Sequence, residues 1–294
     1  MLTETTQEAV QEAAHGAEAA GSGGLSFNPG QSIIGHILDS DRFEVMHGVG
    51  VDLPHLPTVA GVDLTITKHV VMMWLAAVVI GFLVWRAKRR IKDPVPSGLR
   101  NAFEVVILFM RDEVARKSIG PTADRYVPYL LSTFFFILAC NLLGLIPGLA
   151  TATGNISVTA ALALIAFVVI QATGLLKYGL IQHFKNLVPH GLPMWMIPLM
   201  FALELLSMLI KPFALCVRLF ANMMAGHVVI LAFITLIFIF ADLFSPTAAW
   251  LASPVSVGFA LFVYFLELLV ATVQAYIFTM LTATFIGMSA HPAH

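Results

Sequence analysis

Long runs of apolar residues, separated by short breaks of Pro, Gly and polar residues, dominate the chain from about residue 68 onward. A helix that crosses a bilayer needs about 20 mostly apolar residues. The run 68–87 is long enough for one crossing, and the Lys and Arg side chains at its ends can reach the polar surface. The charge-free block 126–176 is long enough for two, because Pro and Gly break it near its middle. The pattern predicts spans at 68–87, 126–147 and 155–176.

Two further apolar runs are much longer and predict long membrane helices at 193–241 and 250–288. At about 1.5 Å per residue the first would extend roughly 70 Å, which exceeds the thickness of a bilayer. We therefore expect a steeply tilted helix with Pro212 as a candidate kink. A break at Ser245–Trp250 then leads into a second long, tilted helix. The fold class expected is an all-α integral membrane protein with five transmembrane helices.

The segment 99–119 is amphipathic and predicts a sixth helix that lies in the membrane interface. At helical spacing, its apolar face carries Ala102, Phe103, Val106, Met110 and Val114. The polar face carries Arg100, Glu104, Arg111 and Asp112. Glu113 and Lys117 interrupt the apolar face in the last turn. Such a helix can lie on the cytoplasmic surface of the bilayer or cover a helix of a partner.

Composition excludes an ordinary soluble protein. Hydrophobic residues make up 59% of the chain and charged residues 11%, whereas soluble domains carry about 25% charged residues. With a net charge of −1 the chain has no basic patch for nucleic acid. The Ala-, Glu- and Gly-rich residues 1–28 are expected to form a mobile tail, and residues 29–290 a single membrane domain.

The distribution of Lys and Arg predicts the orientation in the membrane. Residues 1–67 hold nine acidic residues and one basic residue, whereas 86–125 holds ten basic and five acidic residues. The segment 86–125 is therefore expected in the cytoplasm and the N-terminus in the periplasm. Five crossings then leave the C-terminus in the cytoplasm.

Only seven of the 33 charged residues lie beyond residue 125, and each one inside a span is a candidate functional residue. At about 100° per residue, one stripe about 60° wide holds five polar residues of the fourth span. They are Glu204, Ser207, Lys211, Arg218 and Asn222. His227 falls away from this stripe, just beyond its end. In the last span, Glu267 and Gln274 are seven residues apart and share a face.

These side chains differ in what they can do chemically. Arg218 is a fixed positive charge, whereas His227 and Glu267 can both gain and lose protons. The amides of Asn222 and Gln274 can orient water without holding charge. A fixed cation between titratable and hydrogen-bonding groups suits ion translocation, although His227 as a hydrogen-bonded packing residue stays open. Glu204 and Lys211 could equally mark the hydrated end of a tilted helix.

Other classes of site have no support in the sequence. No nucleophile stands beside a base, and no HExxH, GxSxG or GxxxxGK[ST] motif occurs. We therefore expect neither a catalytic centre nor a metal or cofactor site. A free-standing secondary transporter, with Arg218 binding an anionic substrate, is the alternative. The sequence lacks the inverted repeat and paired broken helices of many such proteins. A transporter of this kind should also purify alone.

Four motifs resemble subunit a of the rotary F-type ATP synthase, over roughly residues 30–290. The fourth span carries RLFANMMAGH from Arg218 to His227, preceded by Lys211–Pro212. The last span combines Glu267 with QAYIFTML from Gln274, and NLLGLIPG followed by NISVT stands mid-chain. The resemblance implies a non-catalytic, proton-translocating subunit of the bacterial inner membrane. Its partners would be a ring of c subunits, the peripheral-stalk b subunits against the 99–119 helix, and lipid.

The resemblance also implies roles for the polar residues. Arg218 would face the essential carboxylate of the ring, favour its deprotonation and separate two offset aqueous half-channels. Asn222, His227, Glu267 and Gln274 match positions of the periplasmic half-channel. Glu204, Ser207 and Lys211 match positions nearer the cytoplasmic exit.

The sequence departs from the family pattern at two places. Some bacterial members carry an acid at the position of His227 and a histidine at that of Glu267, so the pair is exchanged here. Either order is expected to keep an imidazole and a carboxylate near each other. The usual glycine before Asn222 is Ala221, which still allows close approach of a neighbouring helix.

Overall fold

The computed structural model describes residues 42–46, 49–52, 67–89, 98–146, 149–185 and 196–291. The chain forms two compact units. Of the described residues, the larger unit holds those within Asp39–Ala225 and Leu266–His294, and the smaller unit holds Gly226–Phe265. The tail expected at 1–28 and the first residues of the span expected from 193 lie outside the described residues.

Five helices of the described ranges are long and apolar enough to cross a membrane. They are α3 (Lys68–Arg89), α6 (Val127–Gly144), α7 (Ile156–Tyr178), α9 (Ile197–Leu243) and α10 (Pro246–Ala290). Their bounds agree with the predicted spans to about one helical turn. The predicted all-α membrane fold with two long final helices is therefore confirmed.

The break between the last two helices is shorter than predicted. Phe244 and Ser245 alone separate α9 from α10, so most of the predicted break at Ser245–Trp250 is helical. Pro246 occupies the first helical position, where a missing N–H costs nothing. The Ser245 hydroxyl accepts a hydrogen bond from the backbone N–H of Ala248, at 3.3 Å, and so caps the helix. α9 also continues as helix through Pro212.

A short antiparallel strand pair precedes the first span and was not predicted. Strand β1 (Arg42–Met46) pairs with β2 (Val49–Asp52), with an irregularity in register between Glu44 and Met46. Polar and apolar residues alternate over 42–45, which is typical of a strand. The pair adds a small β element to an otherwise helical fold.

The predicted 99–119 helix is present but changes its winding midway. It consists of α4 (Leu99–Leu108), the π-helical segment η1 (Phe109–Ala115) and α5 (Arg116–Ile119). The wider π-helical turns shift the face that the following residues present. Ala115 therefore joins Val114 on the buried face, whereas Glu113 and Lys117 are exposed and form an ion pair with each other. The predicted interruption of the apolar face by Glu113 and Lys117 was therefore wrong.

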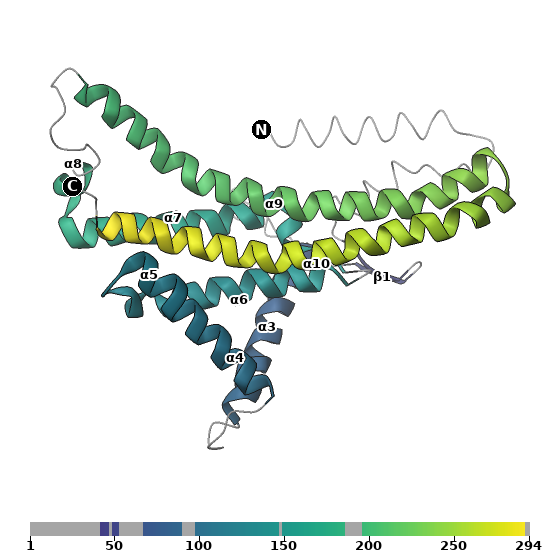
Figure 1. Cartoon of the computed structure of the whole chain (residues 1–294), viewed down its shortest axis with the longest axis horizontal. Coiled ribbons are helices and arrows are strands. Elements are labelled where there is room, and N and C mark those ends of the chain that lie inside the picture. Colours follow the sequence, from purple (N-terminus) through teal and green to yellow (C-terminus); the bar gives the residue numbers. More distant parts are fainter. Residues whose placement is uncertain are drawn as a thin grey trace. The chain divides into compact units, whose positions relative to one another are not determined.

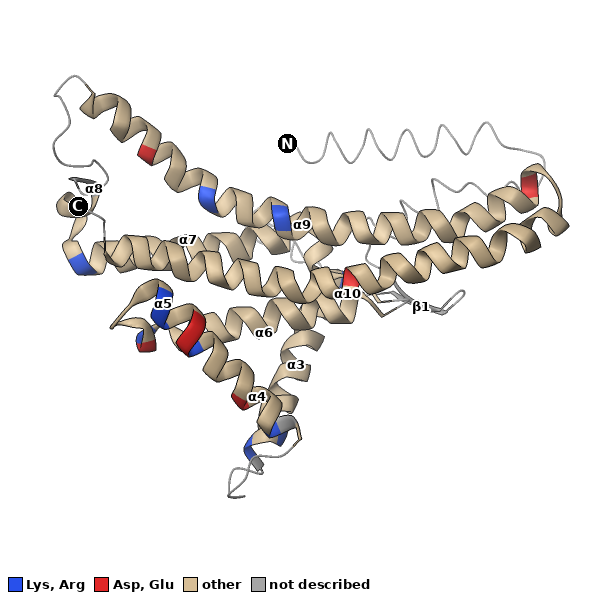
Figure 2. Cartoon of the chain, in the orientation of Figure 1, with Lys and Arg blue, Asp and Glu red and all other residues tan. Residues whose placement is uncertain are grey.

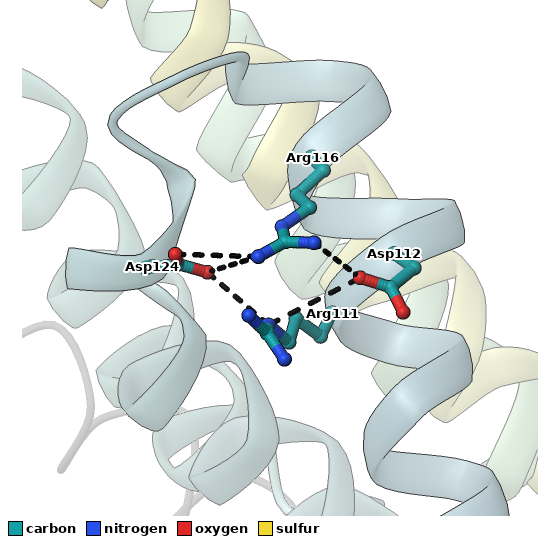
Figure 3. Close-up of polar contacts among 4 residues, drawn as sticks. All are labelled: Arg111, Asp112, Arg116 and Asp124. Carbon is teal, nitrogen blue, oxygen red and sulfur yellow. Dashed lines mark hydrogen bonds and ion pairs between the residues drawn. The ribbon is translucent and has the colours of Figure 1, made fainter.

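Four charged side chains link this helix to the turn before α6 (Figure 3). The Arg116 guanidinium lies 3.0 Å from Asp112 and 3.4 Å from Asp124, which belongs to the 3₁₀ turn η2 (Ala123–Arg125). Arg111 Nε lies 3.3 Å from Asp124 Oδ1 and 4.0 Å from Asp112 Oδ1. Hydrogen bonds from Arg111 and then Arg116 lower the pKa of Asp124 below its ordinary value of 3.8.

The core of the larger unit draws on most of its helices. Met110, Val114, Leu130, Phe134, Ile170, Leu215, Leu219, Phe278 and Ile286 are among its buried apolar residues. They come from η1, α6, α7, α9 and α10, so these elements pack around one apolar centre. A second cluster joins Met72 and Ala76 of α3 to Cys140 of α6 and Ala152 of η3 (Ala152–Gly154). In Figure 1, α6, α7 and the last part of α10 run side by side.

Charge is distributed unevenly within the larger unit (Figure 2). Blue and red segments gather on the α4–η1–α5 helix and the following turn, while α6 is free of both colours. In the smaller unit, the end of α9 and the start of α10 pack through the stacked rings of Phe233 and Phe259, whose centroids are 5.4 Å apart. Thr235 and Ser256 are buried in that unit.

Candidate functional site

Arg218 lies on the exposed side of α9. The buried side of the same helix is apolar and carries Leu215, Leu219 and Met223, all at most 2% exposed. Packing of these three residues into the core leaves the guanidinium outside the helix bundle. Among the residues that the structure describes, no acidic side chain forms an ion pair with Arg218. A charge at membrane depth is costly without such a partner.

One turn further along α9, Asn222 reaches across to α10. Its Nδ2 donates a hydrogen bond to Oε1 of Gln274, at 3.0 Å. The Gln274 side chain is 3% exposed, so its amide needs a partner inside the protein. The structure thus brings together two of the predicted residues that lie 52 positions apart.

Glu267 lies two turns before Gln274 on α10 and is 4% exposed. At about 100° per residue, Glu267, Ala271 and Gln274 fall within one face about 60° wide. A carboxyl group and an amide are therefore presented in the same direction from one helix. His227 lies on α9 in the smaller unit, five residues beyond Asn222. Its expected proximity to Glu267 stays a prediction.

The residues predicted for the cytoplasmic exit lie two to four turns before Arg218 on α9. Lys211 Nζ lies 4.0 Å from Glu204 Oε1 and 5.5 Å from the centroid of the Phe285 ring of α10. Ser207 lies between Glu204 and Lys211 in the sequence and is partly buried. Both charged side chains are about one-third exposed or more, so their ion pair contributes little to stability. A role in ion exit stays a prediction.

Two polar residues of this region were missed by the sequence analysis. Asn141 of α6 and Thr153 of η3 are both fully buried. The Thr153 hydroxyl donates to Asn141 Oδ1, at 2.7 Å, and Asn141 Nδ2 donates to the backbone carbonyl of Ala271, at 3.1 Å. An amide inside an apolar span was the available signal, because such a group must find a partner.

The last turn of α10 is held by α7. The carbonyl oxygen of Ala290 accepts hydrogen bonds from Lys177 Nζ, at 2.6 Å, and from the Tyr178 hydroxyl, at 2.9 Å. The Ser289 hydroxyl donates to the carbonyl of Ile170, at 2.9 Å. α10 is therefore fixed to the bundle both at Ala271 and at its last turn.

The site offers no metal centre within the described ranges, where no group of three or more His, Cys, Asp or Glu side chains could hold an ion. Two long helices, each apolar enough to cross a membrane, carry its ionisable and amide groups. The arginine faces outward, away from the protein's own core.

Comparison with known proteins places this architecture in a family. Residues 70–287 match the family model described as ATP synthase A chain. "ATP synthase subunit a" of Chloroherpeton thalassium is 46% identical over 268 residues, which is 89% of this chain and 76% of that protein. Proteins of the same name are 43% identical in Pelodictyon phaeoclathratiforme, over 99% of this chain and 82% of that protein, and 48% identical in Myxococcus xanthus, over 79% and 75%. The chain belongs to the ATP synthase A chain family and is a bacterial membrane protein.

Proposed function

We propose that the chain is the proton-conducting stator subunit of an F-type ATP synthase. It forms two offset half-channels against a rotating ring of c subunits, so that proton flow turns the ring and drives ATP synthesis. The subunit itself carries out no chemistry on ATP. Family membership and the shared name of its relatives support this assignment over a free-standing transporter.

The observation that carries the proposal is the placement of Arg218. Its guanidinium is exposed on a helix whose other side packs into the core, with no ion-pair partner among the described residues. The exposed neighbours Ala221 and Ala225 are small, so a helix of another subunit can approach closely. A carboxylate at about 4 Å in a medium of effective dielectric 20 would be attracted by roughly 4 kcal/mol. Such attraction favours the deprotonated carboxylate beside Arg218.

The remaining polar residues fit two routes that Arg218 separates. Asn222, Gln274, His227 and Glu267 would pass protons between the periplasm and the ring. Glu204, Ser207 and Lys211 would serve the route to the cytoplasm. Titratable His227 and Glu267 can carry protons, whereas the Asn222–Gln274 amide pair can only orient water between them.

The orientation and the other partners follow from the charge pattern. The basic segment 86–125 belongs in the cytoplasm, which places the N-terminus in the periplasm of the inner membrane and the C-terminus in the cytoplasm. The exposed apolar residues Val105, Ile107 and Leu108 of α4 would contact the peripheral-stalk b subunits and lipid.

The test uses membrane vesicles that carry the whole complex, with native Arg218 or Arg218→Ala. ATP synthesis is driven by an imposed proton gradient, and passive proton flux is recorded after the catalytic head has been removed. We expect Arg218→Ala to lose ATP synthesis while passive flux persists or increases, because the barrier between the half-channels is lost.

Arg125→Ala is the matched control, since Arg125 is also exposed but lies outside the predicted spans. It should support ATP synthesis at the native rate. Unchanged synthesis in Arg218→Ala would show that the arginine is structural and that this mechanism is wrong.

A further inference from the structure

The loop between α6 and α7 folds back into the bundle and reaches α10 through a buried amide. Thr153, Asn141 and Ala271 are all fully buried, and two hydrogen bonds connect them in series. The three residues come from η3, α6 and α10, so the contact ties together elements that are separated by up to 130 positions. We refer to Thr153, Asn141 and the Ala271 carbonyl as the amide clamp.

The direction of these hydrogen bonds is determined by chemistry. A backbone carbonyl can only accept, so the amide nitrogen of Asn141 must face Ala271. The amide oxygen then faces Thr153, whose hydroxyl donates to it. The hydroxyl therefore selects the amide orientation that lets Asn141 hold α10. An ionised carboxylate at position 141 would place two acceptor oxygens face to face, one of its own and that of Ala271.

The loop that supplies Thr153 is itself held in place. Nδ1–H of His69, at the start of α3, donates to the carbonyl of Thr151 at 3.1 Å. Gly144 lies so close to the Thr151 side chain that an added Cβ would overlap its hydroxyl oxygen. Thr151 and Thr153 are both buried. The loop therefore packs between α3 and α6. This packing can hold the amide of Asn141 in one orientation.

The clamp acts on the face of α10 that carries the proposed proton route. Ala271 lies one turn after Glu267 and about one turn before Gln274. A fixed Ala271 sets the rotation of α10 at this level, and with it the directions of the Glu267 carboxyl and the Gln274 amide. Gln274 must point at Asn222 for the 3.0 Å hydrogen bond to form.

We propose that Asn141 and Thr153 are positioning residues for proton transfer, which orient Glu267 and Gln274 by holding the backbone of α10 at Ala271. The inference rests on the proposed function. Neither residue exchanges the transported proton. Their contribution is to keep α10 in one rotation while the ring exerts force on its neighbour α9.

The first test replaces Asn141 by aspartate in the complete complex and follows ATP-driven proton pumping in inverted vesicles. The native pair of hydrogen bonds can form in N141D only while the new side chain is protonated, because the carboxylic acid can donate to Ala271 and accept from Thr153. Burial disfavours the charged form of a carboxyl group, and position 141 is fully buried. We therefore expect the acid to ionise between about pH 6 and about pH 8.5, and the pumping rate relative to native to fall about tenfold over that range.

The ratio to native at each pH removes the titration of groups that both proteins share. On the elements around Asn141, such groups include Lys68 and His69 of α3, Cys140 of α6 and Glu267 of α10. A residue with a merely structural role would lower the amount of assembled complex and leave the ratio independent of pH. A flat ratio overturns the proposal.

Thr153→Val and Asn141→Leu provide a second test that does not depend on N141D. Each should lower pumping about tenfold, and the double variant should be no worse than Asn141→Leu, because both belong to one clamp. The proposal is overturned if the losses of the two single variants multiply in the double variant. It is also overturned if Asn141→Leu pumps at the native rate. Thr282→Val is the matched control, since Thr282 is equally buried but donates within its own helix, to the carbonyl of Phe278.

Arg218→Ala is measured in the same vesicles to separate the two proposals. Native pumping in Arg218→Ala rejects the proposed function. Loss in Arg218→Ala together with a pH-independent N141D ratio rejects the clamp alone.

Discussion

The amide clamp and the ion cluster of Figure 3 hold helices together by opposite means. The clamp is neutral and buried, and each of its polar atoms has a partner of the right kind. The cluster joins two arginines to two aspartates whose side chains are 38% to 62% exposed. One connects α6 to α10 within the spans, and the other connects η1 to η2 outside them.

The difference follows from the medium around each contact. Where water is excluded, a lost hydrogen bond cannot be replaced by one to water, so a hydrogen-bonded amide stabilises the structure strongly. Burying a neutral amide costs little when all of its hydrogen bonds are made. Where water is present, ions are solvated and screened, and each exposed pair contributes at most modestly. We therefore expect substitutions in the membrane contacts to have large effects that salt does not change, and substitutions in the ion cluster to have small, salt-dependent effects.

The largest effect is expected at Gly287 of α10, which packs against α5, the segment that carries Arg116 of the ion cluster. A Cβ at this position would overlap the backbone carbonyl oxygen of Ser118 in α5. Because backbone cannot give way as a side chain can, Gly287→Ala should push the helix with the ion cluster away from α10. We expect a destabilisation of about 3 kcal/mol or more, seen as a lower melting temperature of the complex in detergent.

Gly81→Ala in α3 is the control for that experiment. An added Cβ there meets nothing within 4 Å, and alanine favours the helix by about 0.5–1 kcal/mol. It should leave the melting temperature unchanged or raise it. A stable Gly287→Ala complex would mean that α5 and α10 are not in close contact.

The Asn222–Gln274 pair is expected to separate stability from transport. Gln274→Leu leaves the Asn222 amide without its acceptor and should cost about 1–3 kcal/mol of stability. The double variant with Asn222→Leu removes both polar groups, so most of the lost melting temperature should return. Proton pumping should stay low in both variants, because no amide pair then orients water on this route. Pumping that recovers together with stability in the double variant would contradict the assigned role.

Sequence patterns predicted those features that depend on one helix at a time. The five spans follow from runs of apolar residues, and the shared stripe of Glu204, Lys211 and Arg218 follows from simple helical spacing, because α9 is continuous over all three. Local patterns misled where a helix departs from that spacing. Glu113 and Lys117 were predicted to interrupt an apolar face only because the π-helical turn of η1 was not foreseen.

The features that sequence reasoning missed depend on pairs of distant residues. Asn141 lies in one of the motifs that carry the family resemblance. Its partner is the backbone carbonyl of Ala271, and a pattern of side chains cannot predict which backbone carbonyl a side chain will contact. Thr153 lies in a break that reads as an ordinary turn. The Asn222–Gln274 contact needed the relative rotation of α9 and α10, which the spacing along either helix does not give.

The smallest effect is expected for Asp124→Asn in the ion cluster. Arg111 and Arg116 lower the pKa of Asp124, so the ion pairs stabilise the fold above the ordinary pKa of 3.8, and this stabilisation is lost as pH falls through the lower folded-state value. At neutral pH, Asp124→Asn should lower the melting temperature slightly in dilute salt, and about 1 M salt should abolish the difference from native. Glu104→Gln, which changes an exposed acid of α4 that has no ion pair within the described part of the chain, should have no effect at either salt concentration. A large, salt-independent loss in Asp124→Asn would contradict the contrast between the two regions, because exposed charges would then hold the helices as firmly as buried amides.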